Sequence, residues 1–278
     1  MGIADWLMGM FSSKKTPREA VDEAGLALLR QTRAQHIRGF VGFAPVGPAG
    51  PDDLLSSRVG GPIALPPEQG LPTDEQGKPL IFLLQLNFEH IPQLGAFPSS
   101  GLLQFFIQDN DAFGCAFPST QRHGFQVLYH TDLKDFQPHQ PFAEQLPECH
   151  PFADEAFLRE GVVLTATAGE MKPNLGGVEL DDLWAELLDH FNRATWDAYY
   201  AETGEEPNPE IYIGGHPDFT QEDPRLNEEH SRLDTCILQV SSDELFMWGD
   251  VGMANFFMTE EDLRHRRFEN AVYNWDCS

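Results

Sequence analysis

Seven short runs of apolar residues, bounded by glycine, proline or polar residues, dominate the pattern along the chain. They lie at 79–87, 101–107, 124–129, 161–168, 211–213, 236–240 and 253–258. Apolar runs of this length, rich in β-branched and aromatic residues, are typical of strands buried on both faces. The pattern therefore predicts a protein built mainly on β-sheet.

Helical spacing of apolar residues is less common. Thr16 followed by Pro17 predicts the start of a helix that ends near Gly39, and a second helix is predicted over 181–200. Thr259, three residues before Asp262, predicts a last short helix by the logic of the capping box. The stretch 40–73 is rich in glycine and proline, which predicts an ordered loop region.

Three features of the chain recur at long period. Gly60-Gly61-Pro62, Leu84-Gln85-Leu86 and the segment from Gly101 are followed in the same order by Gly214-Gly215-His216-Pro217, Leu238-Gln239-Val240 and the segment from Gly252, at separations of 154, 154 and 151 residues. Such a match predicts two related units. We expect the glycine pairs to need positive φ or a close backbone approach, and the buried amides of Gln85 and Gln239 to tie the halves together by hydrogen bonds.

The predicted fold class is α+β with an internal duplication. Two related, mostly antiparallel sheet units with flanking helices would pack as one body, because no flexible linker separates them. An N-terminal helical segment would cover 1–38, and the duplicated domain 39–278, with halves at approximately 39–170 and 171–278.

Charge is the most extreme feature of the composition. The chain has 18 Lys and Arg against 44 Asp and Glu, a formal net charge of −26. This charge disfavours nucleic acid and anionic membranes as partners and favours a cationic one. The alternative is that the acidity only keeps the protein soluble.

Candidate partner-binding carboxylates concentrate in turns of the second half. They are Asp181, Asp182, Glu202, Glu205, Glu206, Glu210, Asp218, Glu222 and Asp223. Carboxylates arrayed on a rigid body can imitate the phosphates of DNA and so meet lysine and arginine on a protein partner. The alternative is a solvated acidic loop.

The sequence offers no catalytic, metal or cofactor site. The motifs G-x-S-x-G, H-E-x-x-H and G-x-G-x-x-G are absent, and the four cysteines are too widely spaced for a zinc site. Asp109 opens a segment like a calcium loop, but Phe113 and Thr120 occupy ligand positions. Because the chain shows no secretory signal and no transmembrane run, we expect a cytoplasmic protein.

Four segments resemble the YwqG-like family of bacterial proteins of unknown function. They are Gly60-Gly61-Pro62 with Pro66, the run 79–87, Gly214-Gly215-His216-Pro217 with Gln221, and the run 238–252, which contains Met247-Trp248-Gly249-Asp250-Val251-Gly252. The resemblance covers roughly residues 55–278. It implies an α+β fold with an internal duplication, and a setting in toxin–immunity systems, including nuclease toxins of type VI secretion systems. It implies no catalytic residues.

Our first hypothesis is therefore a cytoplasmic immunity protein that inhibits a cognate antibacterial toxin, most simply a nuclease. It would bind no cofactor and cover the basic active-site cleft of the toxin with its acidic surface. The alternative is an enzyme or small-ligand-binding protein whose site lies in the groove between the halves, lined by Met247, Trp248 and Asp250. A third hypothesis is a housekeeping scaffold with no single partner.

Overall fold

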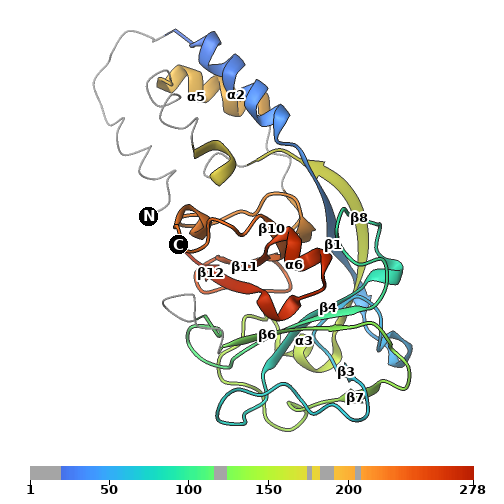
Figure 1. Ribbon diagram of the computed structural model, residues 1–278. Helices are drawn as coiled ribbons and strands as arrows, with labels where there is room; N and C mark the ends of the chain where they lie inside the picture. Colours follow the sequence, from blue (N-terminus) through green and yellow to red (C-terminus); the bar gives the residue numbers. More distant parts are fainter. Residues whose placement is uncertain (1–19, 116–123, 174–176, 182–190, 204–207) are drawn as a thin grey trace.

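The computed structural model describes residues 20–115, 124–173, 177–181, 191–203 and 208–278. Their strands form one ten-stranded sheet in the order β12-β11-β10-β9-β1-β8-β2-β4-β5-β6 and a two-stranded sheet of β3 and β7. All the strand pairs are antiparallel. The large sheet curls almost into a barrel (Figure 1). Rings from its two end strands therefore come together, with the centroids of Phe125 and Tyr273 5.5 Å apart.

The strands are β1 (Arg38–Pro48), β2 (Arg58–Val59), β3 (Ile63–Leu65), β4 (Ile81–Asn87), β5 (Leu102–Ile107), β6 (Phe125–His130), β7 (Gln137–His139), β8 (Val162–Met171), β9 (Ile211–Gly214), β10 (Thr235–Ser241), β11 (Met253–Met258) and β12 (Val272–Asp276). The helices are α2 (Glu23–Gln35), α3 (Glu155–Glu160), α5 (Arg193–Thr203) and α6 (Glu260–Arg264), with single 3₁₀ turns η1 (Pro51–Asp53), η2 (Phe88–His90), η3 (Val178–Leu180), η4 (Pro224–Leu226) and η5 (Phe268–Asn270).

All seven predicted strands are present, and the predicted α+β class with a mostly antiparallel sheet is confirmed. Thr259 caps α6, since its side chain accepts a hydrogen bond from the backbone N–H of Asp262. Thr16, the predicted start of the first helix, and the segment 182–190 of the second predicted helix lie outside the described residues. The described helix α2 is capped by Asp22 and ends at Gln35.

The prediction of a loop over 40–73 is wrong at its start, where β1 runs to Pro48. Proline lacks the backbone N–H that a strand ladder needs, so it is tolerated in strands mainly at edges and irregularities. The register of β1 against β8 shifts between Pro45 and Gly47, which places Pro45 at such an irregularity. Gly39, Gly42, Ala44 and Gly47 also interrupt the apolar pattern of this strand.

The centre of the large sheet is the long antiparallel pair of β1 and β8, which extends from Arg38 opposite Met171 to Pro48 opposite Val162. On its other side β1 pairs with β9, while β8 pairs with β2. β1 and β8 both belong to the N-terminal half, and β1 joins the C-terminal half to the sheet by pairing with β9. The strands of the C-terminal half therefore join the large sheet at β1.

The strand pairs β4–β5 and β10–β11 have equivalent registers. In β4–β5, Gln85 lies opposite Gln104, and the register shifts between Phe82 and Leu84. In β10–β11, Gln239 lies opposite Asn255, with a shift between Cys236 and Leu238. Both the facing amides and the irregularities therefore fall at corresponding positions.

The glycine pairs have the backbone conformation that the sequence predicts. Gly60 and Gly61 have φ of +57° and +73°, and Gly214 and Gly215 have +73° and +61°. A Cβ at Gly60 would lie 2.0 Å from the carbonyl oxygen of Phe157, so this turn also needs a close backbone approach.

We predict that Gly60→Ala lowers the free energy of unfolding by more than about 1 kcal/mol, because alanine is both strained at positive φ and blocked by backbone. Denaturant unfolding measures the change. Gly70→Ala is the matched control, since a Cβ there meets nothing within 4 Å. Equal stability of the two variants would contradict the prediction.

The expectation that Gln85 and Gln239 tie the halves together is wrong. Gln85 donates from Nε2 to the carbonyls of Leu54 and Ser56, in its own half. Gln239 accepts from the hydroxyl of Tyr212, also in its own half. The amides satisfy their hydrogen bonds locally, and the backbone pairing of β1 with β9 joins the halves.

A second, smaller core lies in the helical part at the top of Figure 1. Leu26 and Leu29 of α2 pack with Leu180, Phe191, Trp196 and Tyr199 around α5. The described end of the predicted segment 1–38 is thus covered by residues of the C-terminal half. Within the described segments, every helix is too short or too polar to cross a membrane.

Buried charges lie between this helical part and the sheet. Oε1 of Glu179 on η3 lies 3.1 Å from Arg38, 3.3 Å from His216 and 3.5 Å from Arg225. The side chain of Glu179 is only 6% exposed. Burial alone would raise its pKa, but His216 and the charge of Arg225 outweigh this and lower the pKa to about 2.

We predict that Glu179→Gln lowers the free energy of unfolding by about 3 kcal/mol at pH 7, because the buried guanidinium of Arg225 loses a carboxylate partner and His216 loses its contact with that carboxylate. The folded-state pKa lies below the ordinary value of 4.5, so this stabilisation is present above about pH 4.5 and is lost as the pH falls toward 2. Unfolding curves of variant and wild type should therefore converge over that range. A constant difference would contradict the assignment, and the exposed Glu68→Gln is the control.

Candidate acidic partner-binding pocket

A pocket of about 290 Å³ opens where β9, β10 and β11 meet their loops. Its walls come from the residues before β9, the loop after β9, the end of β10 and the start of β11. The lining residues are Asn208, Pro209, Glu210, Asp218, Ser241, Ser242, Val251, Gly252 and Met253. All of them belong to the C-terminal half, so this pocket does not lie in the groove predicted between the halves.

A buried amide ladder positions Asp218. Oε1 of Gln239 accepts hydrogen bonds from the Tyr212 hydroxyl at 2.8 Å, the Asn255 amide at 2.9 Å and the backbone N–H of Asp218 at 2.7 Å. Gln239 is 1% exposed, so each of these bonds is shielded from water. The ladder therefore fixes the backbone that carries Asp218 into the pocket, where its carboxylate accepts from Asn208 at 2.9 Å.

Glu210 forms the opposite acidic wall. Its carbonyl accepts from the backbone N–H of Ser241 at 2.7 Å, which holds it beside the end of β10. Desolvation and the nearby charges of Asp243 and Asp218 raise the pKa of its carboxyl group. The pocket thus gathers carboxylates that repel one another, and a cation would relieve that repulsion.

The loop 247–252 forms the rim. Ser242 organises it, because its hydroxyl donates to the carbonyl of Gly252 at 2.8 Å and accepts from the backbone N–H of Trp248 at 2.9 Å. Val251 has a φ of +56° and is 60% exposed at the rim. A β-branched residue in this conformation is strained, and such strain is typical of functional loops.

The predicted groove residues separate into two environments. Trp248 is 0% exposed and packs with Phe113 and Phe246, so it is a core residue and lines no groove. Met247 is 44% exposed, and Asp250 is exposed on the same loop. The loop therefore presents these two side chains to solvent beside the pocket and is anchored by the tryptophan between them.

Of the predicted partner-binding carboxylates whose side chains the structure describes, Glu210 and Asp218 lie together in this pocket. Asp181 and Glu222 are exposed and do not line this pocket. Asp182, Glu205 and Glu206 lie outside the described residues, and of Glu202 only the backbone is described, in α5.

Asp223 differs from its predicted place on a binding surface. It is 1% exposed and accepts from the guanidinium of Arg225 at 2.6 Å and 2.9 Å. Its carboxylate also caps η4 by accepting from the backbone N–H of Arg225. A partner could not reach a carboxylate that is buried and ion-paired in this way.

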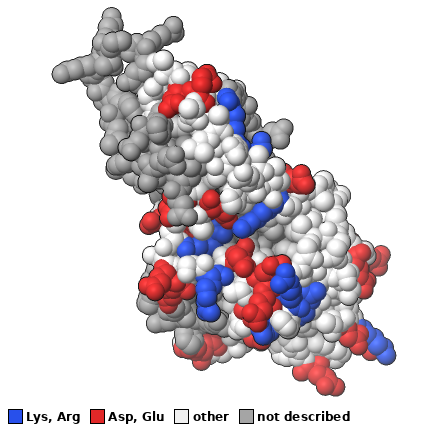
Figure 2. Space-filling model, turned by 45° about the horizontal axis from the view of Figure 1, so that its top comes forward, with Lys and Arg blue, Asp and Glu red and all other residues white. Residues whose placement is uncertain are grey.

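Net charge alone does not locate a site. On the face in Figure 2, lysine and arginine lie among the acidic side chains instead of leaving a continuous acidic area. The position of a binding site is therefore better indicated by the geometry of a pocket than by the overall charge of the protein.

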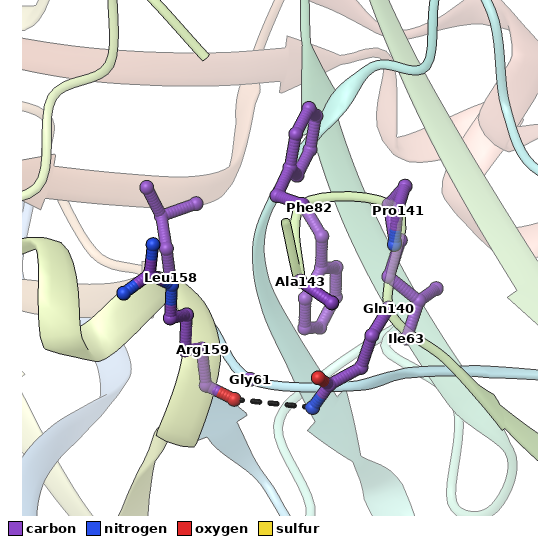
Figure 3. Close-up of a pocket in the computed structure, with 9 residues that line it drawn as sticks. Gly61, Ile63, Phe82, Gln140, Pro141, Ala143, Leu158 and Arg159 are labelled. Carbon is purple, nitrogen blue, oxygen red and sulfur yellow. Dashed lines mark hydrogen bonds between the residues drawn. The ribbon is translucent and has the colours of Figure 1, made fainter. Parts of the chain in front are cut away.

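Another cavity lies between Gly61, the segment 140–143 and α3. It encloses about 10 Å³, room for one water at most. Figure 3 shows how Gln140 closes it by donating to the carbonyl of Arg159 at 3.2 Å. This cavity is too small for a ligand.

The segment at Asp109, which resembles a calcium loop in sequence, makes structural hydrogen bonds to neighbouring segments. Asp109 accepts from Lys78 Nζ at 2.6 Å and from the backbone N–H of Cys149 at 2.7 Å. A hydrogen bond to Asp111 raises the pKa of the Cys149 thiol, so this thiol is a weaker nucleophile than usual at neutral pH. Across the described residues, no group of three His, Cys, Asp or Glu side chains is arranged to hold a metal.

The sequence of this chain matches the model of a domain of unknown function, DUF1963, over residues 57–277. The chain belongs to the DUF1963 family. The DUF1963 match includes the pocket and its rim but begins after β1, the strand at the centre of the sheet. A comparison with curated proteins found no match.

Ser242 and Val251 are among the lining residues that the sequence did not indicate as site residues, and neither did it indicate Asp243, whose charge acts on Glu210. The partners of Ser242 lie in the loop 247–252, so no local pattern reveals its role. Asp243 accepts hydrogen bonds from the nearby backbone N–H groups of Leu245 and Phe246, as an ordinary turn residue does. The positive φ of Val251 has no sequence signal at all, since β-branched residues disfavour it.

We predict that Glu210→Gln leaves the protein as stable as the wild type or raises the free energy of unfolding at pH 7, by less than about 1 kcal/mol because the site is open to solvent. A raised folded-state pKa means that the ionised carboxylate destabilises the fold at neutral pH. The difference should therefore vanish as the pH falls through the carboxyl range. A clear loss of stability at pH 7 would show that Glu210 is a structural residue.

Proposed function

We propose that this protein is a cytoplasmic binding protein that neutralises a positively charged protein partner through the pocket of Glu210 and Asp218. The observation that carries the proposal is the placement of two carboxylates, one with a raised pKa, on fixed backbone beneath a strained and partly apolar rim. Preorganised carboxylates beside exposed apolar side chains suit a lysine or arginine side chain of a partner. This function requires binding alone and no chemical reaction.

The proposed identity of the partner rests on the resemblance to YwqG-like proteins, which is consistent with the DUF1963 match. On that basis the partner is an antibacterial toxin, most simply a nuclease effector of a type VI secretion system, and the protein is its immunity protein. A nuclease cleft is built to receive phosphates, so carboxylates on a rigid surface can occupy it. The net charge of −26 would speed the encounter.

We further propose that the two halves arose by duplication. The equivalent registers of β4–β5 and β10–β11 support this history, as do the paired glycines with positive φ. The acidic pocket is then a feature of the second half alone, since the residue that follows Gly60-Gly61 is Pro62, whereas His216 and Pro217 lead to Asp218 after the second pair.

The test is capture of partners from cells of the native organism at low salt and again at high salt. We expect the wild type to retain a basic protein at low salt. The double variant Glu210→Gln/Asp218→Asn should retain it at least about tenfold less, because close charge pairs across an interface are each worth 1 kcal/mol or more. The captured protein, once purified, should lose its activity when the wild type is added.

Glu68→Gln/Glu144→Gln is the matched control, because it removes the same charge from exposed positions outside the pocket. The two double variants have equal net charge, so only the location of the carboxylates differs. Equal retention by both would contradict a role for the pocket and leave the overall charge as the cause of binding.

A further inference from the structure

The free edge of β6 is the second feature of the surface that suits a partner. β6 pairs with β5 on one side only. The N–H of Gln108 donates to the carbonyl of Gly124, just before β6, which sets the alternation of hydrogen-bonded pairs along the two strands. From this alternation, the backbone groups of Phe125, Val127 and Tyr129 point away from β5, and in the described part of the chain no other backbone pairs with them.

A groove of about 610 Å³ runs along this edge. It is lined by residues 125–129 of β6, by Asp74, Glu75 and Leu80, and by Arg266, Phe268 and Glu269. In Figure 1 the segment with η5, coloured red, lies beside β6, and the rings of Tyr129 and Phe268 are 5.0 Å apart. The outward backbone groups of Phe125, Val127 and Tyr129 therefore border this groove.

Natural sheets usually protect an exposed edge with lysine, proline, a bulge or a covering loop. The sequence of β6, Phe-Gln-Val-Leu-Tyr-His, contains no lysine or proline, and its register against β5 has no shift. At the opposite end of the sheet, side chains of β12 bind to loops: the Asp276 carboxylate accepts from the backbone of Thr220 and Gln221, and the Trp275 indole donates to the carbonyl of Ala112.

The charges around the groove select the occupant. The rim carries the three carboxylates of Asp74, Glu75 and Glu269 against one guanidinium, Arg266, which already donates to the carbonyls of Ala96 and Leu263 at 2.6 Å. A second copy of this chain would bring another net charge of −26 to an acidic rim. A segment with lysine or arginine would meet complementary charge.

We propose that the free edge of β6 binds an extended, cationic segment of a protein partner, which adds one strand to the sheet. Main-chain hydrogen bonds to Phe125, Val127 and Tyr129 supply affinity, and the carboxylate rim selects positive side chains. This surface does not depend on the pocket of Glu210 and Asp218, and its test does not require the proposed toxin.

The probe is a short peptide of alternating lysine and valine, compared with the same peptide N-methylated on alternate residues and with a glutamate–valine peptide. We expect the lysine–valine peptide to slow hydrogen exchange at the amides of Phe125, Val127 and Tyr129. The N-methylated peptide keeps the charge but cannot donate along the edge, so it should bind at least about fivefold more weakly. The glutamate–valine peptide should not bind.

Two variants place the binding on the edge. Val127→Pro removes one outward N–H without breaking a bond to β5 and should weaken binding at least about fivefold. Val127→Ala shortens the same side chain, keeps the N–H and should bind as the wild type does. Glu210→Gln/Asp218→Asn should also leave peptide binding unchanged, which separates this surface from the pocket.

The proposal is overturned if the peptide leaves those three amides unprotected, or if the N-methylated peptide binds equally well, because attraction to charge would then suffice. Dimerisation of the protein that Val127→Pro abolishes would overturn it in a different way, by making a second copy the occupant of the edge. The peptide comparison uses the unmodified protein, so it decides the question even if Val127→Pro fails to fold.

Discussion

The antiparallel pair of β1 and β8 is the constraint on which the rest of the structure depends. β8 connects β1 to the other strands of the first half, and β1 also pairs with β9 of the second half, so this pair links the two parts of the ten-stranded sheet. A connection of this kind explains why the fold is one body without a linker. It also explains why the family match, which begins at residue 57, covers a domain that needs β1 from outside the matched range to complete its sheet.

Buried polar groups then determine where the loops lie. In the first half Gln85 and Gln104 hold the segments near Leu54 and Ala64. In the second half Gln239 holds the loop that carries Asp218. A buried amide without a hydrogen-bond partner would destabilise the fold, so each of these hydrogen-bond networks fixes one loop conformation. The same device that stabilises the sheet thus preorganises the acidic pocket.

Much of this fold could be predicted from the sequence, because strands buried on both faces leave a clear apolar signal. The exceptions have physical causes. β1 contains Pro45 and small residues, and its place in the sheet comes from long-range pairing with β8 and β9. Within the site, Glu210 and Asp218 could be singled out from composition. That Asp223 is buried against Arg225 and that Trp248 belongs to the core could not, since both facts depend on contacts between distant segments.

We infer that Glu210 and Asp218 mark the surface on which a cationic protein partner is neutralised. The most direct test is hydrogen exchange of the protein alone and in complex with the captured partner. The account predicts slower exchange at 208–218 and at 247–253, around the pocket and its rim. Protection that leaves both segments unchanged would contradict it.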